Sequence, residues 1–361
     1  MLQLSKKNAQ MQVPGAAGGF ATALIAGSNS HVKKTDRDVA SQALVQEWVR
    51  CYYGKMKRLW VLVLPFLAFQ NLPAENAVIA YSELSLQATT AAQVRLSFTQ
   101  HFRFPFLQGD SPLTENNNVH VSLGAEVSPV TLGASSAVVW TPIAFFELSA
   151  GGSIASGWNM NIMGDNAYGI GLNLPDAEGN WQNSGSAFDG AHWNARGGAA
   201  LQASLAAFFP GEWNHVIVRT YHQFSHRGYS RASAGQSWFF QNDDGENRNG
   251  FYFYGNFILG YQMPLVLSMV GLIAEAELFL SDSSHERRLW GGDKIYWVFS
   301  TLFHFSPAPQ FGISFFVQFH TQRNFLEPDW RDLYYRNRTL DNSNPVRLQF
   351  HRVAAVFSYR F

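Results

Sequence analysis

The stretch "AQVRLSFTQHFRFPF" (residues 92–106) alternates apolar and polar residues with a period of two. One face of the extended chain is apolar and consists of Val94, Leu96, Phe98, Phe102, Phe104 and Phe106. The other face is polar and carries Arg95, Ser97, Thr99, His101 and Arg103. Because successive side chains of a strand point to opposite faces, the stretch predicts a strand with one apolar and one polar surface.

The same alternation predicts about ten strands, with twelve as the alternative because residues 119–140 are long enough for two short ones. The other predicted strands are 119–131, 143–155, 196–209, 213–225, 251–262, 265–280, 295–305, 311–323 and 346–361. Most are long enough to cross a bilayer, which takes about 9 to 11 tilted residues. The alternation slips at residues 129–136 and 351–352, where we expect bulges.

The connections between these strands alternate in kind. Short ones contain proline, at residues 140–142, 210–212, 264 and 306–309, and long polar ones lie at 108–118, 156–195, 226–250, 281–294 and 324–345. This rhythm is typical of a closed antiparallel transmembrane β-barrel, with tight turns at one end and longer loops at the other. We expect the last strand, 346–361, to close the barrel by pairing with residues 93–106, and residues 75–90 to precede the first strand.

The chain ends in "VAAVFSYRF" (residues 353–361), with Phe357, Tyr359 and Phe361 on one face. This ending resembles the C-terminal strand of outer-membrane β-barrel proteins of diderm bacteria, a porin-like group. The resemblance implies an all-β fold for residues 75–361 and recognition of Phe357, Tyr359 and Phe361 by the barrel-assembly machinery. It also implies contact with outer-membrane lipid.

Residues 56–74, "MKRLWVLVLPFLAFQNLPA", have the pattern of a secretory signal peptide. Lys57 and Arg58 precede a short apolar core, and Ala74 supplies a small residue at the expected cleavage site. The sequence therefore predicts export to the outer membrane. We expect residues 1–55 to be a non-native or disordered extension.

Composition excludes several classes of function. The formal net charge is +0, which gives no basic surface for nucleic acid. The single cysteine, Cys51, lies upstream of the predicted barrel, so the barrel has neither a disulfide nor a thiolate metal site. We expect no cofactor, no metal and no enzymatic activity.

The polar face of the predicted strands would line the barrel interior. Its candidate lumen residues are Arg95, His101, Arg103, Glu126, Glu147, Arg219, Glu275, Glu277 and His320. In one interpretation these opposite charges form paired networks that fill a narrow barrel. In the other, Arg95 and Arg103 face Glu275 and Glu277 across a polar constriction that selects small solutes.

Several functions fit such a barrel. The favoured one is a narrow channel for passive passage of small solutes, and the alternative is an adhesin-like surface barrel without a pore. A fatty-acid-type transporter would use the stretch "PLVLSMVGLIAEAEL" (residues 264–278), whose Leu265, Leu267, Met269 and Ile273 are expected to point inward.

A rim hydrolase is the last alternative. It would use Ser225 with His222 and His226, but residues four apart on a strand lie about 13 Å from each other, which argues against a shared site.

Overall fold

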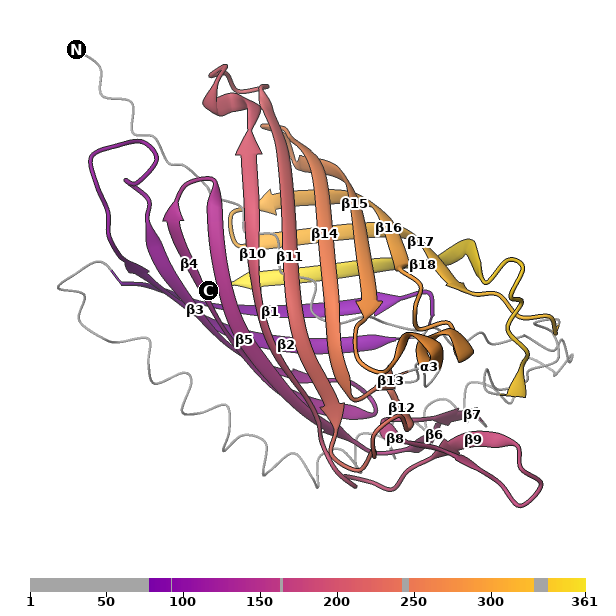
Figure 1. Cartoon of the computed structure of the whole chain (residues 1–361). Helices are drawn as coiled ribbons and strands as arrows, with labels where there is room; N and C mark the ends of the chain where they lie inside the picture. The colour runs from indigo at the N-terminus through magenta and orange to yellow at the C-terminus, as the bar shows by residue number, and fades with distance from the viewer. Residues whose placement is uncertain (1–77, 92, 163–164, 242–246, 328–336) are drawn as a thin grey trace, which may run out of the picture.

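Twelve long strands close into one antiparallel barrel in the computed structural model, which describes residues 78–361 except 92, 163–164, 242–246 and 328–336 (Figure 1). The barrel strands are β1 (Ile79–Thr89), β2 (Val94–Pro105), β3 (Asn118–Val127), β4 (Thr131–Ile143), β5 (Phe146–Gly157), β10 (His192–Ser204), β11 (His215–Tyr229), β14 (Gly250–Gln262), β15 (Leu267–Phe279), β16 (Tyr296–Ala308), β17 (Phe311–Arg323) and β18 (Val346–Arg360). The predicted signal peptide, 56–74, and the extension, 1–55, lie outside the described residues.

The all-β barrel is confirmed, and of the two predicted strand counts the alternative of twelve is right. One added strand is β1, which occupies the segment that we expected to precede the barrel. The other comes from the division of residues 119–140 into β3 and β4, joined by the turn 128–130. The slip predicted as a bulge at 129–136 is this turn and the start of β4.

The barrel closes between β1 and β18, so the predicted pairing of the last strand with residues 93–106 is wrong. The closing register runs from Glu83 opposite Arg360 to Thr89 opposite Ala354. Beyond it, the Phe361 N–H donates to the Ser82 carbonyl (3.0 Å) and the Ser82 N–H donates to the Phe361 carbonyl (2.9 Å). The final residue is therefore part of the seam.

Because residues 119–140 form the two strands β3 and β4, the connection before them lies at the opposite end of the barrel from the one predicted. We call the end that holds the C-terminus the turn end; its connections are 106–117, 144–145, 205–214, 263–266 and 309–310. The loop end holds 90–93, 128–130, 158–191, 230–249, 280–295 and 324–345. The polar segment 108–118 thus lies mainly at the turn end, contrary to expectation, while the later connections alternate as predicted.

The second predicted irregularity is a β-bulge in β18. Gln318 pairs with Arg352 and Phe319 pairs with Phe350, which leaves His351 as the extra residue. The bulge is confirmed, and it changes which side chains of β18 reach the interior.

The outer surface of the barrel is apolar. Alternate residues along the strands are large, hydrophobic and exposed, among them Leu86, Leu148, Val218, Phe224, Leu259, Leu272, Phe303, Phe315 and Phe357. A closed ring satisfies every strand's backbone groups internally, and this outer face suits hydrocarbon. No helix of the described residues is long and apolar enough to span a membrane.

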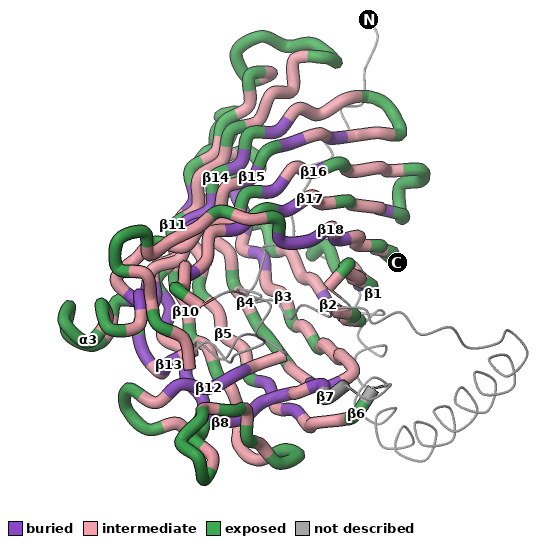
Figure 2. Tube along the Cα trace, turned by 90° about the vertical axis from the view of Figure 1, so that its right-hand side faces the viewer, coloured by how far each residue is buried: buried purple, intermediate pink, exposed green. Residues whose placement is uncertain are grey.

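Two loops of the loop end share a small sheet. Strands β8 (Ile170–Pro175) and β9 (Trp181–Ser184) belong to one loop, and β12 (Ser237–Phe240) and β13 (Asn247–Arg248) to the other. The sheet buries Ile170, Trp238 and Phe239 almost completely, which Figure 2 shows as purple segments in β8 and β12. The first loop also contains the short strands β6 (Met160–Ile162) and β7 (Asp165–Ala167).

A third loop carries the helix α3 (Ser284–Leu289), which begins with a capping box between Ser283 and Glu286. After it, the guanidinium groups of Arg248 and Arg323 lie over the Trp290 ring, with their central carbons 4.3 Å and 5.0 Å from the ring centroid. These cation–π contacts attach the loop to the barrel mouth. A single 3-10 turn, η2 (Leu205–Ala207), follows β10 at the turn end.

Deleting Phe361 is expected to reduce assembly more than stability. The folded barrel loses two backbone hydrogen bonds at the seam, worth about 1 kcal/mol each, whereas the predicted assembly signal loses its last aromatic residue. Surface labelling of cells measures assembly, and urea unfolding of refolded protein measures stability. The conservative variant Phe361→Tyr serves as control, and equal surface amounts of deletion variant and parent would contradict the prediction.

Candidate functional site

The barrel encloses a cavity of about 1820 Å³, lined by residues from all twelve barrel strands. It reaches from Phe145, Phe208 and Pro309 at the turn end to Trp290 and Lys294 at the loop end. The period-two alternation explains its polar wall, since each strand that shows apolar residues to the outside shows polar ones to the interior.

All nine candidate lumen residues lie in this wall. β2 carries three of them, β15 carries two, and the others come from four further strands: Arg95, His101, Arg103, Glu275, Glu277, Glu126, Glu147, Arg219 and His320. Their placement follows from strand parity, that is, from the alternation of successive side chains between the inner and outer face. Their partners depend on the order of the strands in the ring.

Four ion pairs connect charged residues of the described cavity wall, and one of them joins Arg360 to Glu83 at 3.4 Å. Arg95 donates to Glu126 on the neighbouring strand at 3.2 Å and to Gln87 at 2.7 Å. Arg219 donates to Glu147 at 3.0 Å, reaching across β10.

The fourth pair joins Arg227 to Glu277 across β14, and the guanidinium also lies 3.8 Å from the centroid of the Tyr252 ring. Glu275 accepts a hydrogen bond from the Tyr254 hydroxyl. Both acidic residues of β15 are therefore held by partners on nearby strands.

Two stacked histidine pairs line the same cavity. The His101 ring lies between Tyr81 and His120, with centroid distances of 4.5 Å and 5.1 Å, and its Nδ1 is 3.1 Å from Nε2 of His120. His320 stacks on His351 at 4.2 Å. The interior thus combines ionic and stacked polar contacts.

Several basic residues of the wall were not among the candidates. They are Arg196, Arg227, Lys294, Arg323, Arg352 and Arg360. Arg227 was missed because β11 continues to Tyr229, four residues beyond the predicted end. Arg352 was missed because the bulge at His351 obscures the parity; its guanidinium donates to Gln318 and Gln93, both at 2.7 Å.

One part of the interior is apolar. Ile258, Met269, Ile273 and Leu302 are buried against one another, with Phe316 packed on them. The predicted inward orientation of Met269 and Ile273 agrees with this arrangement, whereas Leu265 is exposed in the turn and Leu267 does not line the cavity. The cluster is a packed core that narrows one side of the lumen.

The residues considered for a rim hydrolase do not come together. Ser225 is buried and lies on the inward parity of β11, as do its neighbours Gln223 and Arg227, which line the cavity. His222 and His226 have the opposite parity and contact aromatic residues of the outer face. The serine and the two imidazoles therefore lie on opposite sides of the barrel wall.

The wall carries an excess of positive charge. Among the described residues that line the cavity, nine are lysine or arginine and six are glutamate, an excess of three. A low-dielectric wall strengthens the potential inside such a passage.

The closed ring, the apolar exterior and the polar interior together identify an outer-membrane-type β-barrel of porin-like architecture. By the rule for such barrels the turn end, which holds the C-terminus and lacks the longest connections, faces the periplasm, and the loop end faces outward.

No protein-family model and no curated protein matches the chain. Among solved structures, the KdgM porin aligns at 7% identity and a TM-score of 0.36, covering 78% of this chain and 98% of its own. The β domain of the Bordetella autotransporter BrkA aligns at 8% identity and 0.35, covering 79% and 99%. The translocator domain of NalP from Neisseria meningitidis aligns at 10% and 0.30, covering 87% and 98%.

The interior ion pairs are expected to stabilise the barrel more than exposed ones. A double-mutant cycle of Arg219→Gln and Glu147→Gln, followed by urea unfolding, should give a coupling free energy of about 1–2 kcal/mol, because these side chains are only 25% and 18% exposed. The loop pair Arg231–Asp189, with exposures of 60% and 42%, is the control and should give less than about 0.5 kcal/mol. Equal coupling in both cycles would show that the interior pair has no special role.

Proposed function

We propose that this outer-membrane barrel is a narrow channel for passive passage of small solutes, with a preference for anions. The observation that carries the proposal is the continuity of the cavity: residues of the turn-end connections and residues near the loop-end mouth line one and the same space. A barrel whose interior was filled by side chains would not have one cavity lined by residues from both ends.

The size of the barrel supports a narrow passage. Side chains just fill an interior of about eight strands, and about sixteen strands leave a wide aqueous channel. Twelve strands lie between these cases. The apolar cluster around Met269 and the ion pairs occupy part of the cross-section, so we expect a small conductance and exclusion of large solutes.

The charges of the wall support selection of anions. Four of the six glutamates are paired, with Arg95, Arg219, Arg227 and Arg360. The remaining basic residues, among them Arg103, Arg196 and Arg352, leave the lumen positive. A positive wall lowers the energy of an anion in the passage and raises that of a cation.

Purified protein in planar bilayers should show discrete conductance steps and, under a KCl gradient, a reversal potential of the sign for chloride preference. Arg196→Glu should lower the ratio of anion to cation permeability by about two-fold, because it reverses one charge of the wall. Arg288→Glu in α3 makes the same charge change outside the cavity lining and should leave the ratio unchanged. A protein without conductance steps would refute the channel.

A further inference from the structure

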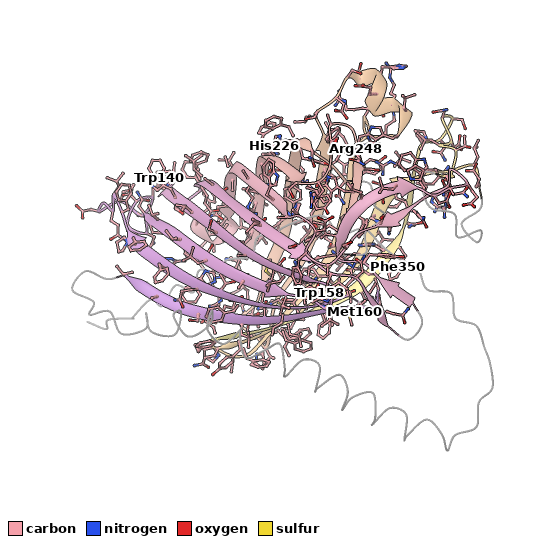
Figure 3. All side chains as sticks on the ribbon, turned by 90° about the horizontal axis from the view of Figure 1, so that it is seen from below. Trp140, Trp158, Met160, His226, Arg248 and Phe350 are labelled. Atoms are coloured by element: carbon pink, nitrogen blue, oxygen red, sulfur yellow. The ribbon has the colours of Figure 1, made fainter. Side chains whose placement is uncertain are left out.

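A polar pair interrupts the apolar outer surface of the barrel in the middle of β11. His222 is exposed and does not line the cavity, whereas its neighbours Tyr221 and Gln223 do. Thr220, two residues earlier, shares its parity and is also absent from the cavity wall. Figure 3 labels His226, which belongs to the same outward parity of β11 as His222.

The register of the strands places His222 near the centre of the membrane. A row of directly paired residues crosses the wall through Trp140, Leu148, Ala199, His222, Gly255, Ala276 and Trp297. Because barrel strands tilt, such a row climbs from one membrane interface to the other, and tryptophans are typical of both interfaces. His222 is the fourth of the seven residues.

The neighbours of His222 along its own strand indicate the same depth. Val218 and Phe224 are 54% and 61% exposed on the same face. The imidazole also contacts Phe253 and Phe257, with centroid distances of 5.9 Å and 5.6 Å. His222 is thus surrounded by residues suited to lipid chains.

One ring nitrogen of His222 has a partner inside the chain. Nε2 lies 2.8 Å from the Thr220 hydroxyl. Among the described residues, Nδ1 has no hydrogen-bond partner, and beside it stands Gly255, on which a Cβ would be 3.7 Å from Nδ1. A polar atom without a partner in hydrocarbon is costly, and lipid chains offer it none.

The surface around His222 allows another wall to come close. On the neighbouring strand β10, Ala199 pairs with His222 and Gly197 follows on the same face; both are small, and neither is buried. Small residues of this kind permit close approach of backbones within a membrane. We call Gly197, Ala199, Thr220 and His222 the His222 face.

We propose that the His222 face is the interface between two copies of this chain, in which His222 of one copy hydrogen bonds to His222 of the other across a two-fold axis. A second copy is the expected partner because of the hydrogen-bonding chemistry of Thr220 and His222. The Thr220 hydroxyl can donate to Nε2 or accept from it, so Nδ1 can be either a donor or an acceptor. Two identical faces are therefore complementary to each other, as an isologous contact requires.

This interface is independent of the proposed channel. It uses the lipid-facing parity of β11, and it would hold for a barrel without conductance.

Cysteine crosslinking in the membrane tests the contact. In a Cys51→Ser background, His222→Cys should give a disulfide-linked dimer on mild oxidation. The matched control is Leu86→Cys on β1, which lies opposite β11 in the ring of twelve and is likewise exposed on the outer face. A dimer at position 222 that exceeds the control at least about five-fold is expected. Equal crosslinking at both positions, or a crosslink of position 222 to a different protein, would overturn the proposal.

A second measurement does not depend on cysteine. Energy transfer between labelled barrels in liposomes should show association of the parent. His222→Leu should weaken this association about ten-fold, because it removes the imidazole of the proposed contact and changes polar atoms only on the outer face. Altered gel mobility of the unheated variant would show that its barrel remains folded. A folded His222→Leu variant that associates as strongly as the parent, or a parent that is monomeric in liposomes, would overturn the proposal.

Discussion

The backbone of a membrane-spanning strand must find every hydrogen bond within the protein, and the rest of this structure depends on that constraint. The ring satisfies it only because β1 meets β18, with Ser82 and Phe361 completing the seam. Closure in turn divides all side chains into two populations, one facing lipid and one facing the lumen. The apolar belt, the polar cavity and the direction of each loop follow from this single closed ladder.

The period of two was enough to recognise a barrel but not to find its first strand. On the outer face of β1, Leu84 and Leu86 are flanked by the small residues Ala80, Ser82 and Ala88, so the apolar signal is weak. The turn after β3 was part only of the twelve-strand alternative, for a different reason. It is short although it lies at the loop end, whereas the prediction assigned short turns to the other end alone.

The interior could be predicted residue by residue but not contact by contact. Parity alone points Arg219 and Glu147 inward, yet their ion pair spans β10 and requires the order and stagger of three strands. The bulge at His351 shifts the parity of β18, which hid Arg352 from the period-two pattern. Pairing between distant segments is a property of the ring, and local alternation carries no information about it.

The small sheet at the loop end joins two segments of the chain that are not consecutive. Since β8 pairs with β12, the shape presented to the outside belongs to neither loop alone. The buried Trp238 and Ile170 leave little freedom in the middle of each loop, whereas turns such as 177–180 are exposed. An antibody against this surface would recognise a folded epitope, and a free peptide copied from either loop would lack it. Sequence variation under such recognition would concentrate at the exposed turns and spare the paired strands.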